Sequence, residues 1–241
     1  MSFPYPIALV TGANRGLGTA LVRALLAAGA SKVYATARNG AQLAPIVAMD
    51  PGRVVPLTLD ITDHAQIAAA VSTASDVQLL INNAGVLDFA GPLDVTHATI
   101  DRNMTTNFTG TFNMTRAFAS VIAANKGGNI TNVLTFLTYV SAPVFSAYNA
   151  SKAASWSMAM SLRPYLAAQN IVISNVFPTT IDTEMVAGLN KTKDTPDDVA
   201  TDIVKGIMAR EEDIYPMGAI NTFRAWQADQ KAVERNFAKI M

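Results

Sequence analysis

The 241-residue sequence contains no cysteine. Disulfide bonds, thiolate nucleophiles and metal sites with sulfur ligands are therefore excluded together. Histidine is nearly as scarce: His64 and His97 stand far apart in polar surroundings, and we predict both at the surface. Their spacing suits neither a metal site nor a catalytic triad. Acid–base chemistry near neutral pH must then use carboxylates, lysine or tyrosine.

The sequence also lacks an excess of charge of either sign and any long hydrophobic run. Eighteen basic side chains balance eighteen acidic ones, so no broad attraction toward nucleic acid or an anionic membrane is expected. No run approaches the roughly 20 apolar residues that span a bilayer. Residues 1–6 lack the basic and apolar segments of an export signal. We therefore expect a cytoplasmic protein that binds a small molecule and neither nucleic acid nor membrane.

Short β-rich apolar runs alternate with longer alanine-rich segments of helical period, as in repeated βαβ units around a parallel sheet. The expected strands are Ile7–Val10, Lys32–Ala37, Val54–Leu59, Leu79–Asn82, Asn129–Leu134, Ile171–Val176 and Asp213–Tyr215. The expected helices are Leu17–Ala28, Gln66–Ala74, Thr99–Ala124, Ala147–Ala168, Pro196–Ala209 and Ile220–Lys239. No linker divides the chain, and its length suits one core. The prediction is a single α/β domain, residues 1–241, with a doubly wound, Rossmann-type parallel sheet of about seven strands.

A glycine-rich turn follows the first expected strand and precedes the first expected helix. It reads Thr11-Gly12-Ala13-Asn14-Arg15-Gly16-Leu17-Gly18. Glycines are needed where the backbone approaches a pyrophosphate and where the helix packs against the strand, and the helix N-terminus offers unpaired N–H groups to the anion. The spacing differs from the general G-x-G-x-x-G fingerprint. It resembles the T-G-x-x-x-G-x-G pattern of the short-chain dehydrogenase/reductase family.

Four further segments resemble motifs of the same family, in the same order along the chain. They are Asn82-Asn83-Ala84-Gly85 after the fourth strand, Asn107 on the next helix, the Y-x-x-x-K pair Tyr148 and Lys152, and the loop from Pro178 to Thr183. Any one of these patterns is common by itself, but their joint order and spacing indicate a family member. The resemblance covers nearly the whole chain and implies a nicotinamide-dependent oxidoreductase.

The resemblance also implies roles for individual residues. Lys152 would hold the nicotinamide ribose, Asn107 would position a water that relays protons to Lys152, and Thr183 would meet the carboxamide. Asp60 matches the position that faces adenine. The residues that the matching motifs assign to the cofactor are Gly12, Asn14, Arg15, Gly16, Leu17, Gly18, Arg38, Asp60, Ile61, Asn83, Ala84, Gly85, Tyr148, Lys152, Pro178, Ile181 and Thr183.

The end of the second expected strand bears on the choice between NAD and NADP. An acidic residue about 20 positions after the glycines favours NAD, whereas arginine accommodates the 2′-phosphate of NADP. The strand ends Ala37-Arg38 without a carboxylate, and Arg15 adds a cation inside the glycine turn. Two guanidinium groups can bind one phosphate through charge-assisted hydrogen bonds. We predict NADP(H); the alternative is that both arginines are ordinary solvated surface charges.

Tyr148 and Lys152 are four residues apart, so on a helix they share one face. Reduction of a ketone creates an alkoxide that needs a proton, and the reverse reaction needs a base. Lowering a tyrosine pKa from near 10 to about 7 requires roughly 4 kcal/mol of preference for the anion. A lysine charge at about 4 Å and an effective dielectric near 20 interacts by roughly that amount before desolvation. Tyr148 is therefore the predicted acid/base.

Two positions depart from the family pattern. Where the family places a serine thirteen residues before the tyrosine, this sequence has Thr135, whose hydroxyl can donate the same hydrogen bond to a substrate carbonyl. Thr138 and Ser141 are rival hydroxyls nearby. Thr179 replaces the usual glycine after Pro178, which predicts a different loop path if that glycine ordinarily takes a positive φ.

The segments around the catalytic motif are bulky and apolar. The expected pocket walls are Phe136, Leu137, Tyr139, Val144 and Phe145 before the tyrosine, with Met185, Val186 and Leu189 after the nicotinamide loop. This inventory favours a hydrophobic ketone, aldehyde or secondary alcohol as the substrate. Some of these side chains belong to the core instead.

Three alternative functions remain open from the sequence. The first is a cofactor-binding sensor that has lost turnover, which the presence of Tyr148, Lys152 and Asn107 disfavours. The second is cofactor-free chemistry such as halohydrin dehalogenation, where the glycine turn is degraded and arginine replaces the lysine. The third is acyl-chain reduction on a carrier protein, which calls for a basic patch that the sequence does not show.

The resemblance also implies a homodimer or homotetramer built on the helices at Thr99–Ala124 and Ala147–Ala168.

Overall fold

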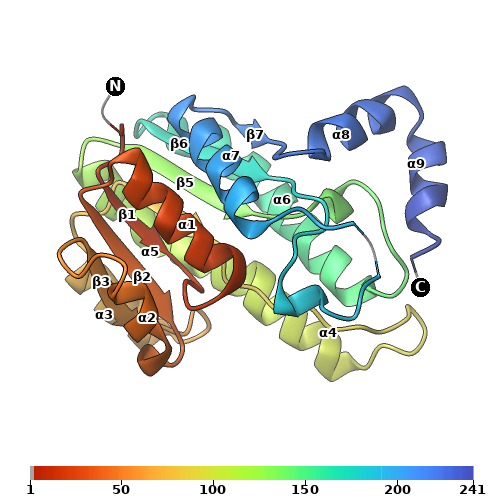
Figure 1. The fold of residues 1–241 in the computed structure, drawn as a ribbon, viewed down its shortest axis with the longest axis horizontal. Coiled ribbons are helices and arrows are strands. Elements are labelled where there is room, and N and C mark those ends of the chain that lie inside the picture. The colour runs from red at the N-terminus through yellow and green to blue at the C-terminus, as the bar shows by residue number, and fades with distance from the viewer. Residues whose placement is uncertain (1–2, 191, 241) are drawn as a thin grey trace.

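The computed structural model describes residues 3–190 and 192–240. Their strands form one parallel sheet in the order β3-β2-β1-β4-β5-β6-β7 (Figure 1). The strands are β1 Ile7–Val10, β2 Lys32–Ala37, β3 Val54–Thr58, β4 Leu79–Asn82, β5 Gly128–Val133, β6 Ile171–Val176 and β7 Asp213–Ile214. Each predicted strand lies within one residue of these bounds. The order reverses between β1 and β4, which opens a crevice at the carboxyl ends of the strands.

Helices cover both faces of the sheet and give two hydrophobic layers. On one face α1 (Gly16–Ala28) and α7 (Pro196–Met208) pack side by side against β1 and β2. On the other face lie α3 (His64–Thr73), α5 (Thr111–Ala124) and α6 (Ser146–Ala167). All residues of β4 and β5 are buried, as expected for strands enclosed on both faces. The predicted doubly wound α/β fold is confirmed.

The predicted helix at Thr99–Ala124 is interrupted. It consists of α4 (His97–Asn103), a π-helical segment η2 (Met104–Gly110) and α5. The wider turn re-aims the side chains on η2, and such segments are frequent at functional sites. Hydrophobic periodicity does not reveal this insertion, because the apolar positions of a helix continue on either side of it.

The prediction of one C-terminal helix over Ile220–Lys239 is wrong. The chain forms α8 (Ala219–Ala228) and α9 (Gln230–Phe237), separated at Asp229, whose backbone is extended at φ −151°. The Asp229 side chain accepts a hydrogen bond from the Ala232 amide and so starts the second helix. Figure 1 shows the pair outside the two helix layers, past β7.

Short helical turns complete the fold. They are η1 (Gly40–Leu43), α2 (Ala44–Val47), η3 (Phe136–Thr138) and η4 (Glu184–Val186). Among the described residues no helix is both long and apolar enough to cross a membrane. His64 and His97 are exposed, as predicted.

Candidate active site

The glycine turn is fixed to the β4 end by short polar groups. The Thr11 hydroxyl accepts hydrogen bonds from the Asn83 and Ala84 amides at 2.9 and 3.0 Å. The Asn83 side chain in turn donates to the carbonyls of Thr11 and Gly12 at 2.9 and 3.1 Å. The two loops that border the sheet crevice are therefore locked together by groups without charge.

The turn leaves no space for side chains at its glycines. A Cβ at Gly12 would lie 3.0 Å from Ala84 Cα, and one at Gly18 would lie 2.0 Å from the Gly12 carbonyl oxygen. Gly16 has φ +53°, and a Cβ there would approach Thr183 Cγ2 at 3.1 Å. This backbone cradle ahead of α1 has the form required for a pyrophosphate, so the residues present fit a dinucleotide.

Two charged residues assigned to the 2′-phosphate lie at the surface. Arg38 is exposed directly after β2. Arg15 is 63% exposed and pairs with Glu184 at 2.5 Å, which joins the glycine turn to the loop after β6. A phosphate bound by Arg15 must therefore compete with Glu184.

The remaining predicted cofactor residues lie along the same edge. Asn14 donates to Gln42 Oε1 at 2.9 Å. Asp60 accepts from the Thr62 amide and hydroxyl at 2.9 and 2.7 Å, and the neighbouring Ile61 is buried. Gly85 lies beside two of the predicted catalytic residues, because a Cβ there would be 3.1 Å from Asn107 Oδ1 and 3.7 Å from Lys152 Nζ.

The loop after β6 follows an ordinary backbone path. Its Pro178 carbonyl accepts from the Phe136 amide at 2.8 Å, and Ile181 packs partly against the core. Thr179 has no positive φ, and its hydroxyl donates to Asp194 Oδ2 at 3.1 Å. The departure from glycine at this position is therefore accommodated without strain.

Tyr148 and Lys152 lie on the buried side of α6. Their exposed fractions are 9% and 5%. Lys152 Nζ donates to the Val133 carbonyl at 2.7 Å and lies 5.8 Å from the centre of the Tyr148 ring. The lysine is thus fixed between the end of β5 and the tyrosine.

Burial shifts the pKa of both groups in the direction of their neutral forms. It raises the pKa of Tyr148 to about 12, and the Thr135 hydrogen bond acts against this shift. Burial also lowers the pKa of Lys152 to about 8. The sequence argument expects the lysine charge to lower the pKa of Tyr148, but the shift is upward because burial of the phenol is its largest cause.

Three hydroxyls compete for the role of the carbonyl-binding group, and the structure separates them. Thr135 is buried, hydrogen-bonds Tyr148, and accepts from the Leu137 amide at 3.3 Å. The Thr138 hydroxyl is occupied by donation to the Thr135 carbonyl at 2.6 Å, and Ser141 is exposed. Thr135 is therefore the hydroxyl placed beside the tyrosine.

Asn107 lies on η2, fully buried against α6. Its Nδ2 donates to Ser151 Oγ and to the Val86 carbonyl at 2.9 Å each, and its Oδ1 accepts from the Val86 amide at 2.8 Å. Its own carbonyl accepts from Ser155 Oγ at 3.0 Å. Ser151 and Ser155 were missed from the sequence, although their spacing from Tyr148 places them on the same helix face.

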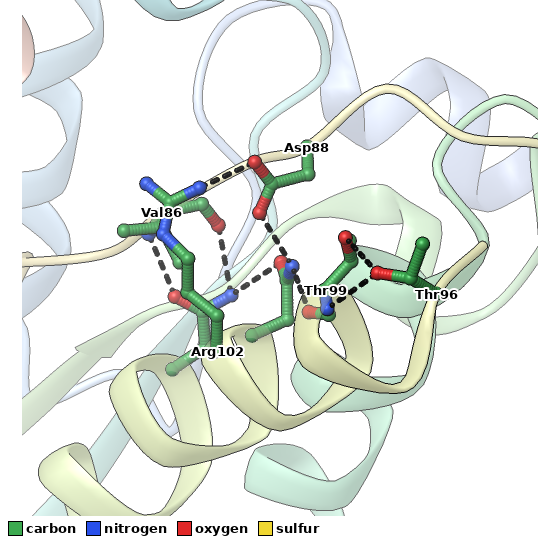
Figure 2. Close-up of polar contacts among 7 residues, drawn as sticks. Val86, Asp88, Thr96, Thr99 and Arg102 are labelled. Atoms are coloured by element: carbon green, nitrogen blue, oxygen red, sulfur yellow. Dashed lines mark hydrogen bonds and ion pairs between the residues drawn. The ribbon is translucent and has the colours of Figure 1, made fainter.

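A second layer of polar groups holds Asn107 in place. Asn103, with no exposed surface, donates from Nδ2 to Asp88 Oδ2 at 2.8 Å and accepts at Oδ1 from Asn107 at 3.4 Å. Figure 2 shows Asp88 reaching from its loop toward α4, where Arg102 also pairs with it. This chain of contacts connects the loop after Gly85 to Asn107, and nothing in the sequence motifs indicates it.

The surroundings of the Tyr148 ring are apolar. Buried Ala142, Phe145 and Tyr148 form a cluster, and the partly buried side chains packed against it are Leu87, Leu137, Val144, Leu189 and Ile240. Phe136 and Tyr139 instead join a separate cluster with α8 and α9. Phe136 is buried there, away from the Tyr148 cluster, whereas Tyr139 also lines a cavity together with Leu137 and Ala142.

The fold and the cradle define a dinucleotide-binding α/β protein, and the comparisons with known proteins identify its family. The family model described as short chain dehydrogenase matches residues 6–194. The chain belongs to the short-chain dehydrogenase/reductase family of oxidoreductases, whose cofactor is a nicotinamide dinucleotide.

Individual relatives are similar over most of their length. A pig (Sus scrofa) protein named carbonyl reductase (NADPH) 2 is 33% identical over 77% of this chain and 75% of its own. A chicken (Gallus gallus) D-erythrulose reductase is 35% identical over the same shares. A short chain dehydrogenase from Burkholderia cenocepacia J2315, solved in complex with NADP, has a TM-score of 0.86 and 36% identity, covering 98% of this chain and 99% of its own.

Proposed function

We propose that this protein transfers a hydride between NADP(H) and a small hydrophobic ketone, aldehyde or secondary alcohol, with Tyr148 as the acid/base. The observation that carries the proposal is the buried Tyr148 hydroxyl, hydrogen-bonded to Thr135 and followed one turn later by Lys152. The Tyr148 ring packs with Phe145 and Ala142 in an apolar cluster, which supports an apolar substrate.

When bound, the nicotinamide supplies or accepts the hydride. Thr135 and Tyr148 donate hydrogen bonds to the substrate carbonyl oxygen and stabilise the charge that develops there. In reduction Tyr148 gives its proton to this oxygen, and in oxidation it removes the proton from the alcohol. Lys152, charged below about pH 8, favours the tyrosinate that reduction leaves behind. The Asn107–Ser151 contact holds α6 against η2 so that these groups stay in register.

The charges at the adenosine end support NADP(H). Arg38 follows β2 where a carboxylate would favour NAD, and Arg15 can turn from Glu184 toward a 2′-phosphate. The NADP complex of a 36%-identical structure supports the same choice. We therefore attribute the preference for NADP(H) over NAD(H) to Arg15 and Arg38, which are both exposed.

The test is NADPH and NADH oxidation against a carbonyl panel. We expect Tyr148→Phe to lower kcat by about a thousandfold with an unchanged Kd for NADPH. Thr135→Val is expected to lose most activity and Thr135→Ser to retain it. Full activity of Tyr148→Phe would disprove the mechanism, and cofactor binding without turnover of any carbonyl would favour the sensor.

Arg38→Asp tests the cofactor assignment. It should lower the preference for NADPH over NADH about 30-fold, which is the loss of one charge-assisted hydrogen bond. Arg224→Asp on α8, also exposed, is the matched control and should leave the preference unchanged. A wild-type preference for NADH would reject NADP(H).

A homodimer or homotetramer through the outer faces of α5 and α6 is part of the proposal. Met160 and Tyr165 of α6 are 42% and 73% exposed, and a contact between subunits on this helix would bury them. Sedimentation equilibrium should give a dimer or tetramer, and Tyr165→Glu should shift it toward monomer. A monomeric wild type would contradict this assignment.

A further inference from the structure

The glycine turn is joined to a different neighbouring segment on each side. Asn14 Nδ2 donates to Gln42 Oε1 at 2.9 Å, and Gln42 lies on η1, four residues after Arg38 in the sequence. The next residue, Arg15, pairs instead with Glu184 on the loop after β6, with 2.5 Å between Nη1 and Oε2. Consecutive residues of the turn therefore have partners from two separate segments. The ion-pair partner of Arg15 does not come from the segment that carries Arg38.

The backbone brings Arg15 and Glu184 within reach of each other. Arg15 is extended, at φ −160°, as the residue before α1, and Glu184 begins η4 directly after Thr183. The two segments approach closely here, because a Cβ at Gly16 would lie 3.1 Å from Thr183 Cγ2. The Arg15–Glu184 pair thus lies where the glycine turn meets the loop that carries Thr183.

An ion pair in this position can exchange partners. The side chains of Arg15 and Glu184 are 63% and 75% exposed, and pairs at such exposure contribute little to stability. A phosphate monoester carries about 1.5 to 2 negative charges near pH 7 and can bind a guanidinium through two parallel hydrogen bonds. A phosphate that binds Arg15 therefore displaces the Glu184 carboxylate, and its affinity is reduced by the contact that is lost.

This exchange gives Glu184 a role in the choice of cofactor. We propose that Glu184 is a specificity-determining residue, which competes with the 2′-phosphate of NADP(H) for Arg15 and so reduces the preference that Arg15 and Arg38 establish. A dinucleotide without this phosphate makes no demand on Arg15. The inference rests on the proposed use of NADP(H) and deepens it, because the preference becomes a difference between two opposing contacts of one arginine.

The test compares the Kd values of NADPH and NADH by calorimetry, because the two dinucleotides differ only in the 2′-phosphate. We expect Glu184→Gln to raise the preference for NADPH about threefold, as for the release of an exposed ion pair, with an unchanged Kd for NADH. Glu234→Gln is the matched control, since it removes a carboxylate from another exposed ion pair, Lys231–Glu234 on α9. It should leave both Kd values unchanged. Thermal unfolding shows whether each variant keeps its fold.

A double-mutant cycle separates competition for Arg15 from simple repulsion between Glu184 and the phosphate. In an Arg15→Met background, Glu184→Gln should leave the NADPH/NADH preference unchanged, because the arginine through which Glu184 acts is absent. The same increase with and without Arg15 would overturn the inference. Glu184 would then act on the phosphate through its charge alone.

The outcomes separate this inference from the proposed function. If the wild type prefers NADPH and Glu184→Gln keeps the same preference, the role of Glu184 is overturned and the use of NADP(H) stands. If the wild type binds both dinucleotides equally, the NADP(H) assignment fails and Glu184→Gln decides the inference. A preference for NADPH that emerges in this variant would support competition for Arg15, and equal binding would overturn it.

Discussion

The glycine turn and the Tyr148–Lys152 pair lie at the same edge of the sheet but are built in opposite ways. In the turn, Thr11 and Asn83 hold the backbone with neutral hydrogen bonds, and its charged residue, Arg15, is exposed. The pair consists of a phenol and an amine that are both buried, and burial shifts the pKa of each. The turn gains its shape from packing, whereas the pair carries the electrostatic cost of burying two titratable groups.

The largest expected effect tests that cost. Because burial lowers the pKa of Lys152 to about 8 from 10.5, the unfolded state binds more protons than the native state above pH 8. Stability therefore rises with pH in this window, by about 2.5 kcal/mol relative to Lys152→Met between pH 7.5 and 10. Urea unfolding of both proteins measures it. Above pH 10, Tyr148 begins to ionise in the unfolded chain and opposes the gain.

A difference in unfolding free energy between wild type and Lys152→Met that stays constant over this pH range would contradict the comparison. It would mean that the Lys152 ammonium is well solvated or paired in the native protein. Burial of Lys152 would then carry no electrostatic cost.

The second effect tests the packing of the turn. Gly18→Ala places a Cβ 2.0 Å from the Gly12 carbonyl oxygen and 2.8 Å from Asn83 Nδ2, so we expect a loss of about 2 kcal/mol in the free energy of unfolding and weaker NADPH binding. Gly188→Ala, where nothing lies within 4 Å, should change stability by less than about 0.5 kcal/mol. Equal losses in denaturant titrations of the two variants would contradict the close approach.

The smallest effect tests the link between the two regions. Asn103→Leu removes the partner of Asp88 and Asn107, and we expect kcat to fall about fivefold and stability by about 1.5 kcal/mol. Asn103→Asp keeps an oxygen that accepts from Asn107 but removes the donor to Asp88, so it tests the two hydrogen bonds separately. Arg102→Gln, on an ion pair whose arginine is 54% exposed, is the control and should leave kcat unchanged. A kcat equal to wild type in Asn103→Leu would show that Asn107 needs no support from α4.

The features predicted from the sequence are those that depend on neighbours along the chain. The strands, the glycine turn and the Tyr148–Lys152 spacing follow from local periodicity and motif order, and the structure places them as expected. The direction in which η3 turns Phe136 depends on what packs above it, so the packing of Phe136 with α8 and α9 was not predictable.

Contacts between distant segments were not predictable. Arg15 and Glu184 are 169 residues apart, and no residue pattern marks their pairing. The break at Asp229 was locally encoded by an N-capping side chain, but the apolar spacing of Val233 and Phe237 continued the helical period across it. No sequence pattern predicts that Ile240 packs on the cluster that contains Tyr148, because the residue lies after the last helix.

The position of Ile240 has a practical consequence for how the protein is handled. A peptide fused closely behind it, such as a purification tag, would start beside the apolar cluster that contains Tyr148, while one fused ahead of Phe3 would start near the opposite, amino end of β1. Rates measured on a C-terminally extended preparation would therefore report the tag as well as the enzyme. Material intended for substrate profiling is better extended at its N-terminus.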